Sequence, residues 1–265
     1  MANRPNPFAV VTGASRGIGA AYARALAAQQ YDLLLVSRDR TRLTTLASEL
    51  QDQHNVSVEF ELLDLALSDA AHRLYSAARN RRETVDLLIN NAGFGLFGRF
   101  VTIPLPRIQE MLQVHINTIV ESIRLFLPAM IERRAGGIIN VSSIAGLLPL
   151  PYLAEYAATK AFLISFSVAL AEEVRTTGVR IQACCPGQTQ TDFHATAGLQ
   201  PRSPFTMQSS EEVVRVSLAA LAKGSPVTTI GWQGRIYAFL AKWVPRPILL
   251  RATSKRTNPD RNTSR

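Results

Sequence analysis

Three side chains in the middle of the chain have the residue types and the spacing of a proton-transfer site. Tyr156 and Lys160 are separated by three residues in the stretch EYAATK, so on a helix they lie one turn apart on the same face. Ser143 lies thirteen residues before Tyr156. A lysine ammonium favours the charged form of a nearby phenol and lowers its pKa from about 10. Tyr156 is therefore a candidate proton donor to a substrate oxygen, and Ser143 a candidate hydrogen-bond donor to that oxygen.

The same spacing also occurs on helices that carry no chemistry, because any two residues four apart share a helix face. The second interpretation is therefore a plain helix surface. Tyr152 has no lysine four residues further on and serves as an internal control. The choice between the two interpretations depends on whether the fold brings Ser143 next to Tyr156.

The elements that must position these residues alternate regularly along the chain. Apolar stretches such as LLLV and LLIN are apolar on both faces, which is typical of buried parallel strands. Strand and helix patterns in alternation predict a doubly wound α/β sheet with helices on both faces, and ligands bind such a sheet at the carboxyl ends of its strands. We expect strands at 8–11, 32–37, 56–63, 85–90, 137–141, 179–184 and 226–230, and helices at 17–29, 40–53, 70–81, 107–134, 153–177 and 210–223.

The first strand runs into the glycine-rich stretch TGASRGIG, residues 12–19, which opens the first helix. Gly13, Gly17 and Gly19 let the backbone turn tightly and approach a pyrophosphate, whose charge is stabilised by the N–H groups of the helix N-terminus. A simple helix-entry turn is the alternative. The flanking strand and helix favour a nucleotide site.

The second strand ends in LVSRD, where NAD-binding folds commonly place a carboxylate for the ribose hydroxyls. Here Ser37 stands at the tip, followed by Arg38, and Arg16 lies in the glycine loop. Two guanidinium groups favour a 2′-phosphate and hence NADP(H). Asp39 would argue against NADP(H) if its carboxylate turned inward toward the ribose. The alternative for Arg38 is that it is a solvated surface residue.

The ordered set of motifs resembles the short-chain dehydrogenase/reductase family, three-glycine type. TGASRGIG, NNAG at 90–93, the serine–tyrosine–lysine spacing and PG at 186–187 occur in the family's order over nearly the whole chain. The resemblance implies a single Rossmann-like domain with a seven-stranded parallel sheet. It also implies hydride transfer between NADP(H) and a carbonyl or hydroxyl group, with Ser143, Tyr156 and Lys160 catalytic, and Ser143 and Tyr156 contacting substrate.

The resemblance further implies a set of cofactor-binding residues and a homo-oligomer. The cofactor set is Gly13, Ser15, Arg16, Gly17, Ile18, Gly19, Arg38, Asp64, Asn91, Ala92, Gly93, Tyr156, Lys160, Pro186, Gly187 and Thr191. The chain departs from the family at His115, where an asparagine usually supports a water-linked proton path to the lysine. His115 either hydrogen-bonds such a water or packs in the core, and Asn117 lies roughly 200° further round the helix.

Three apolar segments are candidates for the substrate side: residues 94–100, 146–153 and 193–205. They favour a hydrophobic carbonyl compound, such as a fatty or steroid-like ketone or aldehyde. The alternative is that they pack in the core or in a subunit interface. A non-catalytic NADP-binding sensor or structural module is the rival function, although such a module does not need Ser143.

Charge and cysteine content bound the remaining possibilities. The net charge is +9, and residues 234–265 hold eight basic residues against one acidic residue. We place residues 1–252 in the domain, with 234–252 either resting on a membrane or covering the pocket, and we expect 253–265 to be a disordered basic tail. The sequence shows no basic face with interleaved aromatic residues, so we do not expect the protein to bind nucleic acid.

The neighbouring cysteines Cys184 and Cys185 have no metal-ligand spacing, so we predict small buried residues and no metal. The absence of a signal-peptide pattern favours the cytoplasm, with membrane association as the alternative.

Overall fold

The computed structural model describes residues 5–189 and 207–258. Its centre is a parallel sheet of seven strands in the order β3-β2-β1-β4-β5-β6-β7. The order reverses between β1 and β4, and this reversal point is where doubly wound sheets bind ligands. The predicted α/β sheet is confirmed. The strands are β1 (Phe8–Thr12), β2 (Asp32–Ser37), β3 (Val58–Leu62), β4 (Leu87–Asn90), β5 (Gly136–Val141), β6 (Val179–Cys185) and β7 (Val227–Thr229).

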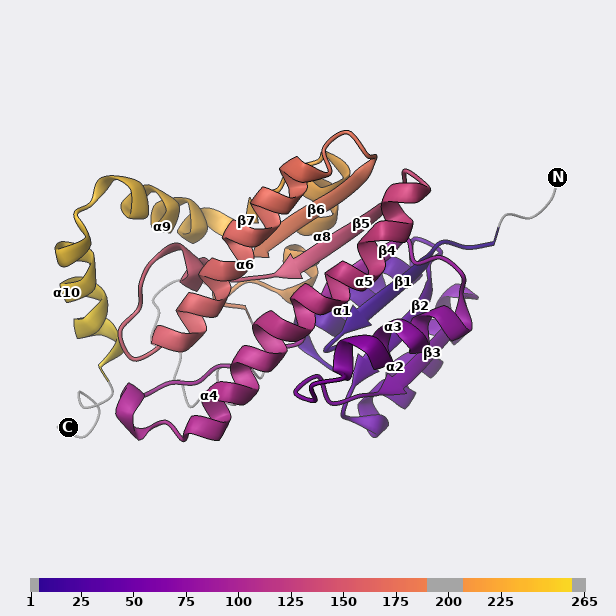
Figure 1. The fold of residues 1–265 in the computed structure, drawn as a ribbon, viewed down its shortest axis with the longest axis horizontal. Helices are drawn as coiled ribbons and strands as arrows, with labels where there is room; N and C mark the ends of the chain where they lie inside the picture. The colour runs from indigo at the N-terminus through magenta and orange to yellow at the C-terminus, as the bar shows by residue number, and fades with distance from the viewer. Residues whose placement is uncertain (1–4, 190–206, 259–265) are drawn as a thin grey trace.

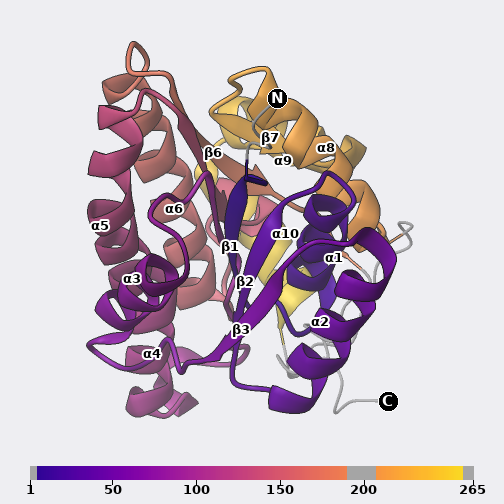
Figure 2. The same ribbon diagram turned by 90° about the vertical axis from the view of Figure 1, so that its right-hand side faces the viewer.

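Helices cover both faces of the sheet because alternate residues of each central strand point to opposite sides. In β1, Val11 belongs to the core under one helical layer and Val10 to the core under the other. One layer holds α1 (Gly17–Ala27), α2 (Arg40–His54) and α8 (Ser210–Ala222); the other holds α3 (Ala70–Arg81), α5 (Thr118–Glu132) and α6 (Ala154–Glu173) (Figure 1). Figure 2 shows the two layers on either side of the sheet.

The long helix predicted over 107–134 is interrupted. It consists of α4 (Leu105–Leu112), a π-helical turn at Gln113–Asn117, and α5. A π turn accommodates one extra residue per turn and is frequent at functional sites. Two short 3-10 helices, η1 (Phe100–Thr102) and η3 (Ile144–Leu147), follow β4 and β5.

The prediction of a disordered tail from residue 253 is wrong for its first residues. Helices α9 (Gly231–Trp243) and α10 (Arg246–Thr257) follow β7, so residues 253–257 are helical. The hydroxyl of Thr253 donates to the Leu249 carbonyl at 2.8 Å, and that of Thr257 to the Pro151 carbonyl at 2.9 Å. The polar side chains thus bond to the backbone instead of favouring disorder. Residues 259–265 lie outside the described part of the chain.

Two helical stretches are long and apolar enough to cross a membrane by length and composition: Leu105–Glu132 and α6. In their most apolar windows 44% and 33% of the residues, respectively, are buried inside the protein. Both stretches pack on the sheet, and core helices of α/β proteins satisfy the same criterion. This finding is therefore weak evidence for a membrane span.

Candidate active site

The three predicted catalytic residues meet at the carboxyl end of β5. Ser143 follows β5 and caps the start of η3, where its hydroxyl accepts from the backbone N–H of Ala145 at 3.1 Å. Tyr156 and Lys160 lie in the first turns of α6, and both are buried. The Lys160 ammonium is 5.7 Å from the Tyr156 ring centroid, and Ser143 hydrogen-bonds the Tyr156 hydroxyl. The sequence therefore predicted which residues come together.

Lys160 by itself does not lower the pKa of Tyr156, whose predicted lowering also involves an oxidised nicotinamide beside the lysine. Burial raises the pKa of Tyr156 to about 12, and only the hydrogen bond with Ser143 acts in the opposite direction. Burial is the larger of the two influences on the phenol, because it disfavours the charged phenolate. Tyr156 is consequently protonated at neutral pH, which is the form that donates a proton.

Lys160 is held in place at the closest approach of α6 to β5. The Lys160 ammonium donates to the Val141 carbonyl at 2.8 Å, and the Lys160 backbone carbonyl accepts from the Ser142 hydroxyl at 2.7 Å. Burial lowers the pKa of Lys160 to about 8. A Cβ at Gly146 would lie 2.6 Å from the Lys160 carbonyl carbon, so glycine is required there for η3 to pack on α6. No motif in the sequence indicates this role of Gly146.

His115 is a packed, hydrogen-bonded histidine, which decides between the two alternatives left open by the sequence. Its Nε2 accepts from the backbone N–H of Phe94 at 3.0 Å, so Nδ1 carries the proton and donates to the Thr159 hydroxyl, also at 3.0 Å. The Thr159 hydroxyl donates to the Tyr156 carbonyl at 2.8 Å. Burial, with Lys160 nearby, holds the pKa of His115 well below its usual value, so the ring is neutral.

The same histidine fixes the loop after β4. A Cβ at Gly93 would lie 2.8 Å from the His115 Nε2, so a larger residue here would displace the imidazole from the loop. The π turn places His115 where it meets both the loop and α6. His115 is therefore a buried link between the predicted cofactor loop and the helix of Tyr156.

The glycine loop is braced by the loop after β4. Gly13 and Gly17 have φ angles of +65° and +56°, which disfavour other residues, and a Cβ at Gly19 would lie 2.2 Å from the Gly13 carbonyl oxygen. The Asn91 side chain donates to the carbonyls of Thr12 and Gly13 at 2.9 and 3.2 Å. These two hydrogen bonds from Asn91 stabilise the conformation of the glycine loop.

The first turn of α1 suits a phosphate group. No side chain caps it and no acidic residue lies in it, whereas Asp39 caps α2 and Ser209 caps α8. Uncapped N–H groups and the helix dipole stabilise an anion at this point. The donor set therefore fits the pyrophosphate of the predicted dinucleotide.

The end of β2 resolves the question raised by Asp39. Its carboxylate accepts from the Arg42 backbone N–H at 3.1 Å and caps helix α2, so the carboxylate already has a role in the fold. Arg38 forms ion pairs with Asp64 at 3.3 Å and with Glu110 at 3.8 Å. Asp64 therefore lies against Arg38, and Glu110 on α4 is a second neighbour that no sequence motif indicates.

Other predicted residues fall around this edge. The Ser15 hydroxyl accepts from Ser37 at 2.9 Å, which ties the glycine loop to β2. The Pro186 carbonyl accepts from the Ile144 N–H at 3.0 Å, which brings the PG stretch beside η3. Ala92 donates its N–H to the Thr12 hydroxyl at 3.2 Å. Thr191 and the segment 193–205 lie outside the described residues.

Two of the three predicted apolar segments converge on Tyr156. Tyr156 packs with Met111 and Leu153 in one buried cluster. Partly buried residues of the segments 94–100 and 146–153 pack against it, namely Phe94, Leu96, Phe97 and Leu150. The predicted proton donor therefore lies in an apolar environment.

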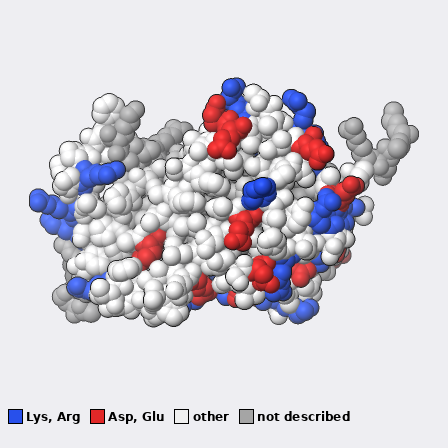
Figure 3. Space-filling view, viewed as in Figure 1, with Lys and Arg blue, Asp and Glu red and all other residues white. Residues whose placement is uncertain are grey.

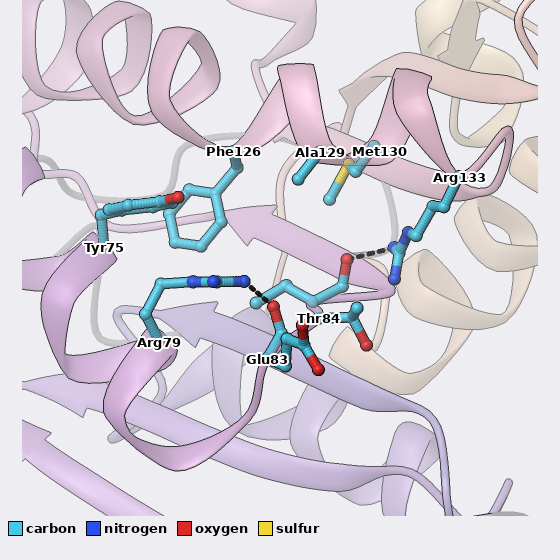
Figure 4. Close-up of a pocket in the computed structure, with 9 residues that line it drawn as sticks. Tyr75, Arg79, Glu83, Thr84, Phe126, Ala129, Met130 and Arg133 are labelled. Carbon is cyan, nitrogen blue, oxygen red and sulfur yellow. Dashed lines mark hydrogen bonds between the residues drawn. The ribbon is translucent and has the colours of Figure 1, made fainter.

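A small pocket elsewhere does not belong to this site. It lies between α3 and α5 near the amino end of β4 and is lined by Tyr75 and Phe126, among others (Figure 4). Arg79 and Arg133 at its rim donate to the carbonyls of Glu83 and Val85. The predicted catalytic residues lie at the other end of the sheet.

The two cysteines are free and fully buried, as predicted. Burial raises the pKa of Cys184 to about 11 and that of Cys185 to about 12. Both thiols are therefore uncharged at neutral pH, and neither is a candidate nucleophile.

Comparison with known proteins adds an independent finding. The family model for short chain dehydrogenases matches residues 7–202. The very-long-chain 3-oxoacyl-CoA reductase of Rattus norvegicus is 30% identical over 250 residues, which cover 91% of this chain and 78% of that protein.

Two solved structures are similar over most of their length. The short-chain dehydrogenase from Sphingobium yanoikuyae in complex with NADPH has a TM-score of 0.81 and 30% identity, covering 88% of this chain and 91% of that one. The bulky-bulky ketone specific alcohol dehydrogenase from Comamonas testosteroni has a TM-score of 0.75 and 26% identity, covering 95% of this chain and 92% of that one.

Proposed function

The chain belongs to the short-chain dehydrogenase family, and on that premise we propose that it is an NADP(H)-dependent reductase of hydrophobic ketones or aldehydes. The observation that carries the proposal is that Tyr156 lies in an apolar cluster, with its hydroxyl hydrogen-bonded to Ser143 and its ring 5.7 Å from the Lys160 ammonium. A buried acid beside an apolar surface suits a carbonyl substrate with a large hydrocarbon part.

The residues divide the chemistry between them. NADPH, when bound, supplies the hydride that adds to the carbonyl carbon. Ser143 and Tyr156 hydrogen-bond the carbonyl oxygen, and Tyr156 transfers its proton to that oxygen as the alcohol forms. Lys160 stabilises the phenolate that remains, and solvent returns the proton. His115 holds the loop at Phe94 and the helix of Tyr156 in register.

The cofactor is held at the other side of the same edge. The loop from Gly13 to Gly19 and the first turn of α1 take the pyrophosphate. Arg38 and Arg16 take the 2′-phosphate, for which Arg38 exchanges part of its pairing with Asp64 and Glu110. The remaining cofactor contacts come from Ser15, Ile18, Asn91, Ala92, Gly93, Pro186, Gly187 and Thr191.

The names of the relatives favour the same substrate class. One relative reduces very-long-chain 3-oxoacyl thioesters by its name, and a solved neighbour is specific for ketones with two bulky substituents. The apolar residues packed around Tyr156 agree with such substrates. The expected homo-oligomer and the cytoplasmic location stay predictions.

A screen of NADPH oxidation tests the proposal. Methyl ketones, aldehydes, 3-oxoacyl thioesters and steroid ketones of increasing size are compared, with NADH in parallel and Tyr156→Phe as the matched control. We expect kcat/KM to rise with hydrocarbon length and NADPH to be preferred. Cofactor binding without reduction of any substrate would favour the rival function, a non-catalytic NADP-binding module.

A further inference from the structure

Helix α9 carries a stripe of large apolar residues on its outer face. Trp232, Ile236, Phe239 and Trp243 are 53%, 45%, 61% and 67% exposed. Their spacing of four, three and four residues places them within an arc of about 60° on one side of the helix. A soluble surface rarely presents four such residues in one contiguous patch, so the stripe marks an interaction surface.

The opposite side of α9 packs on the active site. Gly234 is buried on that side, and a Cβ there would lie 2.8 Å from the Thr229 Cβ and 3.3 Å from the Ile144 Cγ2. Ile144 begins η3 and directly follows the catalytic Ser143. Helix α10 is tied to the predicted substrate segment by the bond from Thr257 to Pro151. The two helices therefore form the end of the molecule next to the catalytic edge (Figure 1).

The charge of this segment is of one sign. Residues 231–258 contain six Lys and Arg residues and no Asp or Glu. Arg246, Arg251 and Lys255 on α10 are exposed, and in Figure 3 the end of the molecule that carries α10 shows blue and no red. Exposed Ile248, 59% accessible, adds apolar surface between them.

We propose that α9 and α10 dock on the surface of an anionic lipid bilayer. A helix with Trp and Phe on one face and basic residues nearby is the arrangement that inserts at the boundary between headgroups and acyl chains. The basic residues of α10 are attracted to anionic headgroups. A protein partner or a second copy would also cover an apolar stripe, but neither explains why the whole segment lacks acidic residues.

Docking in this orientation places the catalytic edge close to the lipid surface. If the substrate is a hydrophobic ketone or aldehyde, which rests on the proposed function, it reaches Tyr156 from the bilayer rather than from water. The docking itself does not depend on that chemistry. Binding and activity are therefore measured separately.

The chain offers an internal probe for this test. Its only two tryptophans are Trp232 and Trp243, both on α9. The full-length protein is titrated with phosphatidylcholine vesicles and with vesicles that also contain phosphatidylglycerol, and tryptophan emission is recorded. We expect a blue shift and quenching by brominated acyl chains, stronger with the anionic vesicles and weakened by salt.

Two variants and a control separate the contributions. Ile236→Ser/Phe239→Ser should lower the vesicle partition coefficient at least tenfold, since both side chains lose apolar burial. Arg246→Gln/Arg251→Gln should lower it about 20- to 30-fold for anionic vesicles only. Leu67→Ser removes an apolar residue that is 44% exposed before α3 and should change nothing.

A tryptophan emission spectrum that neither kind of vesicle changes would overturn the proposal. So would a blue shift that appears without vesicles and grows with protein concentration, because it would identify a second copy as the partner. Reduction of a short, water-soluble ketone is assayed on every variant as a check of folding. Loss of vesicle binding with that activity intact supports docking, whereas an inactive protein that still binds vesicles leaves docking intact and refutes the proposed function.

Discussion

Two buried tyrosines, Tyr22 and Tyr156, lie on opposite faces of the sheet. Burial raises the pKa of both, so both are protonated at neutral pH. The Tyr22 hydroxyl donates to Ser217 at 2.6 Å, and the Ser217 hydroxyl donates to Gln182 at 2.7 Å. The Gln182 amide donates back to the Ser217 carbonyl at 3.2 Å, which closes the network.

The comparison shows that burial alone does not make a phenol a catalytic acid. The hydroxyl of Tyr22 is committed to a closed core network, and its neighbours Cys184 and Ser217 are uncharged at neutral pH. Tyr156 instead borders an apolar cluster and has a buried ammonium beside its ring. Access and charge distinguish the two residues, and both can be tested.

The largest expected effect is on turnover by Tyr156→Phe. The ring and its packing stay, but the proton donor is lost, so kcat should fall about 10²–10⁴-fold while NADPH still binds. Tyr152→Phe is the matched control on the neighbouring segment and should be nearly silent. Comparable kcat values for Tyr156→Phe and the unmodified protein would place Tyr156 in the same class as Tyr22.

The second effect concerns the charge that distinguishes the two sites. Folding lowers the pKa of Lys160 from 10.5 to about 8, so the unfolded chain binds more protons between these values and stability rises with pH across this range. Below pH 8 the buried ammonium costs about 3 kcal/mol.

Lys160→Met removes that cost. The variant should be about 2–3 kcal/mol more stable than the unmodified protein at pH 7, and most of the gain should vanish at pH 10, as measured by urea unfolding. Its turnover and cofactor affinity should both fall. Lys223→Met, at an exposed position, is the control. A gain that is independent of pH would show that Lys160 is not a buried charge.

A third prediction extends the comparison to two ion pairs. Arg38 pairs with Asp64 at the predicted 2′-phosphate position, and Arg24 pairs with Glu49 at 2.8 Å on the outer side of α1. Arg38→Asp should weaken NADPH binding by about 1.5–3 kcal/mol and leave NADH binding unchanged. Arg24→Asp should leave both affinities unchanged. Equal affinities of the unmodified protein for NADH and NADPH would contradict the cofactor assignment.

The smallest effect is expected at Tyr22. Tyr22→Phe should leave turnover within about twofold of the unmodified value and destabilise the fold by about 1–3 kcal/mol, because the Ser217 hydroxyl loses a buried partner. Calorimetry and the ketone assay measure the two quantities on the same sample. A variant with normal stability and reduced turnover would reverse the roles of the two tyrosines.

The sheet was predictable from the sequence because its central strands β1, β2 and β4 are nearly continuous apolar stretches that need burial on both faces. Strand β2 and helix α3 have the predicted bounds, and the other predicted strands and helices differ by a few residues at their ends, except that the helix predicted over 107–134 contains a π turn and that α9 and α10 were not predicted as helices. Ser143, Tyr156 and Lys160 were predictable because their spacing is local and strand ends in a parallel sheet share one edge.

The rest depends on contacts between distant parts of the chain. His115 hydrogen-bonds Phe94 and Thr159, which only the folded chain brings together. These two bonds join the π turn to the loop after β4 and to α6. Glu110 reaches Arg38 from another element, and Ser217 lies 195 residues after Tyr22. The helical residues 253–257 were missed because the hydroxyls of Thr253 and Thr257 bond to backbone carbonyls.

The most direct test of the account follows the hydride itself. NADPH deuterated at both C4 positions is incubated with the best ketone of the screen, and the alcohol is analysed by mass spectrometry in the unmodified protein, Tyr22→Phe and Tyr156→Phe. We predict one deuterium on the carbinol carbon at similar rates for the first two proteins and a rate about 10²–10⁴-fold lower for Tyr156→Phe. Deuterated alcohol formed equally fast by Tyr156→Phe, or slowed by Tyr22→Phe instead, would contradict it.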